Sequence, residues 1–81
     1  MWYVYFLQSK VKKFLYIGYS GNLTKRMTQH AQGKVQSTER FRPLELICYI
    51  VLPTQKQAIN LEKYFKTGSG RAILKKRILQ I

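Results

Sequence analysis

Hydrophobic residues are concentrated in three runs that predict β-strands. The first two, residues 2–7 and 14–19, are aromatic and β-branched, and a polar, Lys-rich stretch at residues 8–13 separates them. This arrangement is typical of a β-hairpin. The third run, residues 44–52, is apolar on both faces apart from Glu45, which predicts a central strand that is covered from two sides.

The segment after the second strand predicts a helix. Asn22 is placed to cap a helix that ends at Gly33, because a short polar side chain suits the first position and glycine the last. Leu23, Met27 and Ala31 share one face of this helix.

The rest of the chain predicts a loop and two more helices. Residues 34–43 are polar and show little periodicity, so we expect a long exposed loop. Thr54 and Gln57 form a capping box for a second helix, which is expected to end at Gly68. A third, basic helix starts just after this glycine. The predicted order is β-β-α-β-α-α, and residues 1–81 are expected to form a single domain.

The charge of the chain indicates the kind of partner. Fifteen Lys and Arg oppose three acidic residues, which gives a formal charge of +12 on 81 residues. Because 46% of the residues are hydrophobic, the charge belongs to the surface of a folded domain, which is typical of a polyanion binder such as a nucleic-acid-binding protein. No apolar run approaches the roughly 20 residues that span a bilayer, and no signal peptide is visible, so no membrane partner and a cytoplasmic location are expected.

The scarcity of acidic residues restricts the chemistry. There is no Asp, and the only carboxylate side chains are Glu39, Glu45 and Glu62, which excludes a carboxylate-rich metal cage. Cys48 and the single His cannot form a four-ligand zinc site. Glu62 lies in or beside the apolar stripe of the second helix, where it is either paired with a Lys or Arg or holds a metal ion. One carboxylate is sufficient for Mg²⁺, which typically keeps several waters.

Two other groups of side chains are candidates for chemistry. Arg26 and His30 are four residues apart on the first helix and either bind one anion or form a solvated basic flank. Tyr5 and Tyr16 either pack in the sheet or share a face, where nearby cations would favour a phenolate base. Gly18 marks a bulge or a close backbone approach in the second strand.

These residues occur in an order that resembles the GIY-YIG nuclease superfamily, and most closely its small stand-alone bacterial members. The similarity spans essentially the whole chain, and the elements that carry it are Tyr3-Val4-Tyr5, Tyr16-Ile17-Gly18, Asn22-Leu23, Arg26, His30, Glu62 and Gly68 to Arg71. Tyr3 replaces the leading glycine of the first motif, and no Asn follows Glu62.

The resemblance implies an α+β fold with a three-stranded antiparallel sheet flanked by helices. It also implies a metal-dependent endonuclease that hydrolyses DNA phosphodiester bonds, with structure-selective cleavage as an open alternative. The cofactor would be Mg²⁺ or Mn²⁺, held by Glu62, with no small-molecule cofactor besides the metal. The residues carried over as catalytic are Tyr5, Tyr16, Arg26, His30 and Glu62, and we expect the tyrosines, the arginine and the glutamate on one concave face of the sheet.

DNA is the expected partner, with RNA as an alternative. The basic residues that we expect to contact nucleic acid are Lys12, Lys13, Lys25, Lys34, Arg40, Arg42 and Arg71. Two other functions fit the same charge and size: a nucleic-acid-binding module that is catalytically weak or inactive, and a structural RNA-binding protein.

Overall fold

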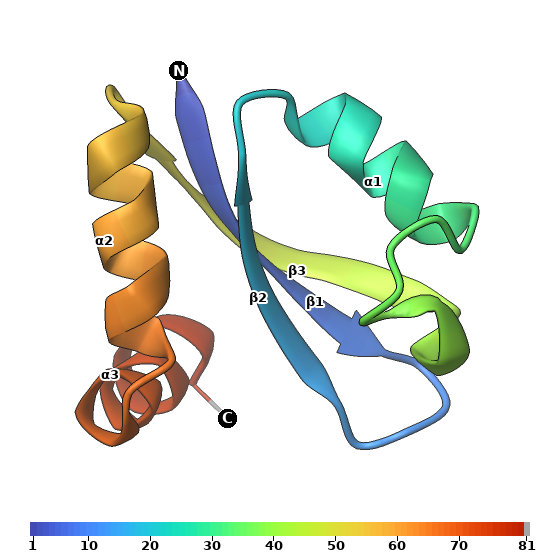
Figure 1. Cartoon of the computed structure of the whole chain (residues 1–81). Coiled ribbons are helices and arrows are strands. Elements are labelled where there is room, and N and C mark those ends of the chain that lie inside the picture. The colour runs from blue at the N-terminus through green and yellow to red at the C-terminus, as the bar shows by residue number, and fades with distance from the viewer. Residues whose placement is uncertain (81) are drawn as a thin grey trace.

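One three-stranded antiparallel sheet organises the molecule (Figure 1). The computed structural model describes residues 1–80 and contains strands β1 (Trp2–Ser9), β2 (Leu15–Ser20) and β3 (Leu44–Leu52). The hairpin of β1 and β2 is confirmed, and β3 has the predicted bounds. The order of the strands is β2-β1-β3, so β1 is the central strand and both others lie at an edge.

The predicted central position of the third strand is therefore wrong. β3 pairs only with β1, and one of its faces packs on the core through residues such as Ile50 and Leu52. The other face leaves Leu46, Tyr49 and Val51 exposed. An apolar run does not distinguish a strand buried on both faces from one that exposes an apolar face, because the difference depends on which strands pair.

The pleat of β1 sends alternate side chains to opposite faces of the sheet. Val4 and Phe6 point to one face, and Tyr5 points to the other. In the register of the sheet, Tyr5 lies between Gly18 of β2 and Tyr49 of β3. The pairing thus fixes which groups surround the tyrosine.

Helix α1 (Leu23–Ala31) follows β2, and the structure confirms both of its predicted ends. The Asn22 side chain accepts a hydrogen bond from the backbone N–H of Lys25 at 3.0 Å. Gly33 has φ +76°, the left-handed conformation that glycine adopts without strain.

Helix α2 (Gln55–Phe65) begins with the predicted capping box, and α3 (Gly68–Ile73) follows it. The prediction that Gly68 ends α2 is wrong, because α2 ends three residues earlier and Gly68 opens α3. The Thr67 hydroxyl caps α3 by accepting a hydrogen bond from the backbone N–H of Gly70 at 3.0 Å. The basic terminal segment continues as a π-helix, Leu74–Leu79.

The hydrophobic core lies between the sheet and the C-terminal helices. Helices α2 and α3 lie on one side of the sheet and α1 on the other, with β2 between α1 and α2 in the view of Figure 1. The core residues alternate along the strands and repeat at helical spacing in α2. They are Val4, Phe6, Ile17, Ala58, Phe65 and Leu74.

The segment between α1 and β3 differs from the predicted exposed loop. It contains a single 3₁₀ turn, Glu39–Phe41, and it buries the side chains of Val35 and Thr38. The Ser9 hydroxyl at the end of β1 donates a hydrogen bond to the carbonyl of Phe41 at 2.7 Å. The loop is thereby held against the sheet. Among residues 1–80, no helix has both the length and the apolarity to cross a membrane.

Candidate active site

Tyr5 meets two side chains of α1 on the face of the sheet opposite the core. Its hydroxyl oxygen lies 2.8 Å from Nε2 of His30 and accepts a hydrogen bond from Nε of Arg26 at 3.4 Å. The pleat of β1 directs the phenol toward α1, and the four-residue spacing places Arg26 and His30 on one side of that helix. The structure thus brings three of the predicted catalytic residues together.

Thr38 contacts the other ring nitrogen of His30, on the side of the imidazole away from Tyr5. Its Oγ1 lies 2.7 Å from Nδ1 of His30 and donates to the carbonyl of Val35 at 3.4 Å. We assign the single hydroxyl proton to the Val35 carbonyl, so the hydroxyl oxygen accepts the proton of Nδ1. This assigns the tautomer in which Nε2 is unprotonated and accepts the O–H of Tyr5. The hydrogen bonds therefore run in one direction from Arg26 through Tyr5 and His30 to Thr38.

Burial keeps Tyr5 and His30 uncharged. It raises the pKa of Tyr5 to about 12, although the hydrogen bond from Arg26 acts in the opposite direction. It also lowers the pKa of His30 to about 4, and the positive charge of Arg26 adds to this effect. The expectation that nearby cations favour a phenolate is therefore wrong for Tyr5, because loss of solvent outweighs the one cation that contacts the hydroxyl.

Tyr16 lies beside this group, and Gly18 makes room for it. The Tyr16 ring centroid is 6.2 Å from that of Tyr5 and 5.3 Å from that of His30. A Cβ atom on Gly18 would lie 2.6 Å from the Tyr5 hydroxyl oxygen and 2.9 Å from the Tyr16 ring. The close approach expected at Gly18 is thus made by aromatic side chains, which occupy the space that a larger residue would need.

Arg26 retains donors that can bind an anion. Among residues 1–80, its guanidinium uses Nε toward Tyr5 and Nη1 toward Oε1 of Gln29, at 3.1 Å. A guanidinium has five N–H donors, so three remain for a ligand. The hydrogen bond to Tyr5 also raises the pKa of Arg26, which therefore stays charged.

Glu62 comes from the opposite side of the sheet. It lies on α2, which packs on the core face, whereas Tyr5, Tyr16 and Arg26 meet on the α1 face. The prediction that all four share one concave face is therefore wrong. The strand order explains this separation. Because β2 is an edge strand, side chains from the two faces of the sheet can approach each other around that edge.

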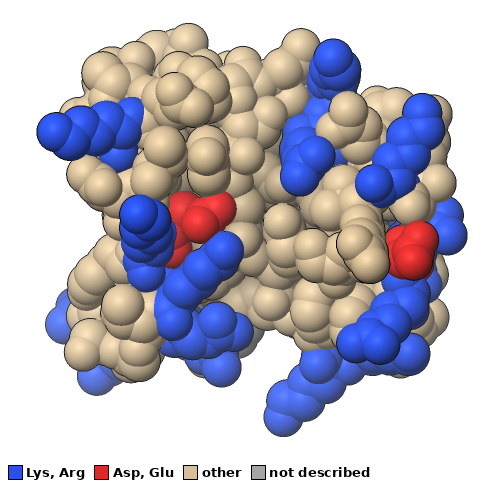
Figure 2. All heavy atoms as spheres, viewed as in Figure 1, with Lys and Arg blue, Asp and Glu red and all other residues tan. Residues whose placement is uncertain are grey.

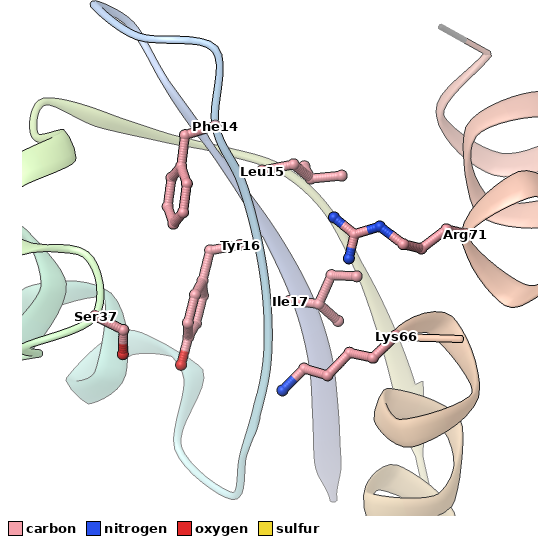
Figure 3. Close-up of a pocket in the computed structure, with 7 residues that line it drawn as sticks. All are labelled: Phe14, Leu15, Tyr16, Ile17, Ser37, Lys66 and Arg71. Carbon is pink, nitrogen blue, oxygen red and sulfur yellow. The ribbon is translucent and has the colours of Figure 1, made fainter. Parts of the chain in front are cut away.

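A cavity of about 390 Å³ lies along the β2 edge (Figure 3). Phe14 and Tyr16 extend toward Ser37 on one side of the strand, and Lys66 and Arg71 reach toward it from the other side. Lys66 forms an ion pair with Oε1 of Glu62 at 3.1 Å. The cavity therefore joins the tyrosine side of the site to the ion pair that contains the glutamate.

The structure confirms that Glu62 is paired with a cation, and its role as a metal ligand stays a prediction. The carboxylate is paired, as the structural interpretation predicts, and its side chain is largely buried, with 16% exposed. Residues 1–80 contain no cluster of three or more His, Cys, Asp or Glu side chains, so a metal bound here would have few protein ligands. The donor set fits Mg²⁺ or Mn²⁺ held by one carboxylate, with water and phosphate oxygens as the other ligands.

The predicted nucleic-acid-binding residues are not all free for that purpose. Arg42 donates hydrogen bonds to the backbone carbonyls of Glu39 and Ala31 and so fastens the loop to α1. For the other six positions, contact with nucleic acid stays a prediction. Figure 2 shows basic side chains on both sides of an uncharged band of the surface. Lys12 and Arg40 lie near the Phe41 ring, Lys13 and Arg71 line a cavity, and Lys25 and Lys34 are exposed.

Thr38 and Lys66 are the site residues that the sequence did not reveal. Thr38 lies in an aperiodic polar loop, where nothing marks it as buried. Lys66 stands four residues after Glu62, and this spacing was a usable signal for an ion pair on a helix.

Comparisons with known proteins agree with this fold. Residues 1–77 match the family model of the GIY-YIG catalytic domain. A UPF0213 protein of Streptococcus pyogenes serotype M3 is 37% identical over 71 residues, which cover 86% of this chain and 76% of that protein. A UPF0213 protein of serotype M5 is 35% identical over the same shares of both chains. No solved structure matches significantly. This chain belongs to the GIY-YIG family and has its nuclease-type fold.

Proposed function

We propose that this protein is an endonuclease that hydrolyses DNA phosphodiester bonds with the help of one divalent metal ion. GIY-YIG domains are generally endonucleases that use divalent metal ions. The observation that carries the proposal is the contact of the Tyr5 hydroxyl with both Arg26 and His30, which lies beside a basic cavity. A chain that only binds nucleic acid has no need to orient a buried phenol in this way.

Tyr5 would receive the proton of the attacking water. Its oxygen donates to His30 and accepts from Arg26, so one lone pair remains for the water. Tyr5 is fully buried in the structure, so the water reaches this lone pair only when the side chains that cover the hydroxyl move. As the water oxygen bonds to phosphorus its proton becomes acidic and passes to Tyr5, while the phenol proton moves to Nε2 of His30. With its pKa of about 4, His30 is a weak base, so this transfer accompanies bond formation and does not precede it.

Arg26 would stabilise the charge that develops on the phosphate. Its three uncommitted donors suit two phosphate oxygens at once, and such charge-assisted pairs are stronger than neutral hydrogen bonds. Tyr16 lies within reach of the same phosphate because it lines the cavity and contacts the Tyr5 ring.

Glu62 would hold the metal ion, which when bound supplies Lewis acidity to a phosphate oxygen. Lys66 neutralises the carboxylate when no metal is present, and its side chain is half-exposed. Exchange of this partner for a hydrated cation therefore requires movement of a flexible surface side chain only.

The test compares two carboxylates in one assay. Purified protein is incubated with flapped, branched, nicked and plain duplex DNA in Mg²⁺ or Mn²⁺, and Glu62→Ala is compared with Glu45→Ala. Glu45 is an exposed residue at the start of β3 and serves as the control. We expect Glu62→Ala to lose about 100-fold or more in rate, as removal of a transition-state ligand does, and Glu45→Ala to cleave normally. Equal cleavage by both variants would contradict the proposal.

A catalytically inactive binding module is the alternative, and the Glu62–Lys66 ion pair favours it because the pair satisfies the carboxylate without a metal. DNA affinity measured in EDTA separates the two functions. An endonuclease loses cleavage in Glu62→Ala while its affinity is unchanged. A binding module shows no cleavage in the wild type on any of these substrates.

A further inference from the structure

A stacked aromatic pair lies at the end of the β1–β2 hairpin, outside the hydrogen-bond chain of the active site. The rings of Phe14 and Phe41 are 3.7 Å apart and nearly parallel, with an interplanar angle of 4°. Lys12 and Arg40 lie 5.5 Å and 5.1 Å from the Phe41 ring centroid. Both phenylalanines are only half-buried, so the pair is not part of the hydrophobic core.

Phe14 also lines two adjoining cavities. The first, of about 390 Å³, is the one along the β2 edge, and the second has a volume of about 340 Å³. Both include Phe14, Leu15 and Arg71. Phe41 covers one face of the Phe14 ring, and Phe14 is only half-buried, so part of its surface is open to these cavities.

The walls of the two cavities are strongly basic. No carboxylate is among the lining residues, and the four cations are Lys13, Lys66, Arg71 and Lys75, of which Lys66 is paired with Glu62. The volumes fall in the range of about 300–1,000 Å³ that is typical of sites for small organic groups. A ring surface beside several cations suits a group with one flat aromatic part and a negatively charged part, which is the chemistry of a nucleotide.

We propose that Phe14 is a stacking platform for an unpaired base of a DNA strand, whose phosphates lie against Lys66 and Arg71. The inference rests on the proposed function and adds to it that the preferred substrate has an unstacked nucleotide next to the cleaved bond. Phe41 supports the platform from behind, and Lys12 and Arg40 hold Phe41 in turn.

An unpaired base fits this site better than an intact duplex does. In a duplex both faces of each base are covered by its neighbours, so a side-chain ring is able to stack only on a base that has left the helix. Tyr16 lines the same cavity as Phe14 and stands next to Tyr5. A nucleotide stacked on Phe14 therefore lies close to the proposed catalytic group.

Binding measurements in EDTA test the platform without cleavage. The probes are a duplex with a single-stranded flap that carries 2-aminopurine and a blunt duplex with the same number of phosphates. Phe14→Ala is compared with Phe14→Leu, which keeps apolar volume, and with Phe14→Trp, which keeps an aromatic face. Stacking on a protein ring is worth about 1–3 kcal/mol per base, so we expect Phe14→Ala to weaken flap binding by about 5-fold to 150-fold.

The affinities of the three Phe14 variants for the two probes decide the inference. It is supported if Phe14→Leu resembles Phe14→Ala, Phe14→Trp restores affinity and 2-aminopurine quenching, and blunt-duplex affinity changes little in all three. Unchanged flap affinity in a Phe14→Ala protein with a wild-type circular dichroism spectrum overturns it, and so does an equal loss for both probes. If flap binding does not depend on Phe14 while wild-type protein still cleaves DNA, the stacking proposal is wrong and the proposed function is unaffected. If flap binding depends on Phe14 but no cleavage occurs, the nuclease proposal fails and the platform remains.

Discussion

The two faces of the central strand are equally buried but chemically opposite. Val4 and Phe6 on one face and Tyr5 on the other are all fully inaccessible to solvent. The first face packs apolar side chains from β2, α2 and the C-terminal helix, whereas the second packs a phenol against His30. Burial therefore does not distinguish the core from the candidate site in this protein. What distinguishes them is whether polar atoms are enclosed.

The enclosed polar atoms are all satisfied. No buried side-chain nitrogen or oxygen in residues 1–80 lacks a hydrogen-bond partner. An unpaired group in this position would cost about 1–3 kcal/mol, so the α1 face is stable only while its hydrogen bonds remain complete. The core face has no such requirement, because its stability comes from apolar area and close packing. The two faces should therefore respond to different perturbations.

The largest effect is expected on the core face. Phe6→Ala removes a fully buried ring that packs against Phe65, and we expect it to lower the free energy of unfolding by about 3–5 kcal/mol. Tyr5→Phe on the other face keeps the ring and loses one hydroxyl, and we expect it to lower the free energy of unfolding by about 1–2 kcal/mol. Urea denaturation of both variants measures the difference. Equal losses would show that the faces contribute alike and would contradict the comparison.

Acidification should act on the α1 face alone, and strongly. The pKa of His30 is about 4 in the folded protein and about 6.5 in the unfolded chain. As the pH falls below about 6.5, only the unfolded state takes up the proton, so stability is lost until about pH 4. The total loss through His30 is about 3 kcal/mol. Above pH 6.5 its contribution does not change.

Denaturation curves at a series of pH values measure this effect, with His30→Gln as the control. The control variant is expected to be less stable near pH 7 but to lose less stability between pH 6.5 and pH 4. If the free energy of unfolding falls equally with pH in the wild type and in His30→Gln, the fold does not hold His30 neutral. The α1 face would then exclude solvent less well than the contacts indicate.

A smaller difference in stability is expected between alanine substitutions at two glycines. A methyl group on Gly18 would contact the Tyr5 hydroxyl at 2.6 Å, whereas one on Gly68 would meet nothing within 4 Å. Gly18→Ala should therefore cost about 1–3 kcal/mol through overpacking and also reduce cleavage by displacing Tyr5. Gly68→Ala should be neutral or slightly stabilising, since alanine is the better helix former. Similar behaviour of both variants in denaturation and cleavage assays would mean that Tyr5 tolerates displacement.

Thr38→Val gives a small expected change in stability and the most specific information about the site. It keeps the shape of the side chain but removes the acceptor for the Nδ1 proton of His30, at a cost of about 1–2 kcal/mol. Without this acceptor the imidazole is free to adopt the other tautomer, which reverses its hydrogen bond with Tyr5. Nitrogen chemical shifts of His30 report the tautomer directly. A variant that keeps Nδ1 protonated would show that Thr38 does not set the direction of the chain.

Much of the local structure was predictable from the sequence. The hairpin, the bounds of the third strand, the Asn22 cap and the capping box at Thr54 all depend on residues that are close in sequence. The end of α2 was misplaced because Thr67 offers a helix start that precedes the glycine. Within the candidate site, the proximity of Tyr5 to Arg26 and His30 followed from a shared motif order and helical spacing.

Three properties of the site depended on contacts between distant segments. The loop residue Thr38 reaches His30 only because the loop folds back over α1. The pKa of Tyr5 is raised because the effect of burial outweighs the effect of the single cation that contacts the hydroxyl. The net charge of the chain does not predict this balance. The separation of Glu62 from the tyrosines across the sheet follows from the position of β2 at an edge.

By itself the sequence determined the elements, their order and the residue types available for chemistry, because periodicity, capping and motif spacing act over a few residues. Tertiary structure decided the strand order, the direction of the hydrogen-bond chain and the Phe14–Phe41 pair that borders the basic cavities. These depend on which surfaces meet when the sheet is covered. Dehydration and pairing of polar atoms are properties of such meeting surfaces, so they arise only when distant parts of the chain pack together.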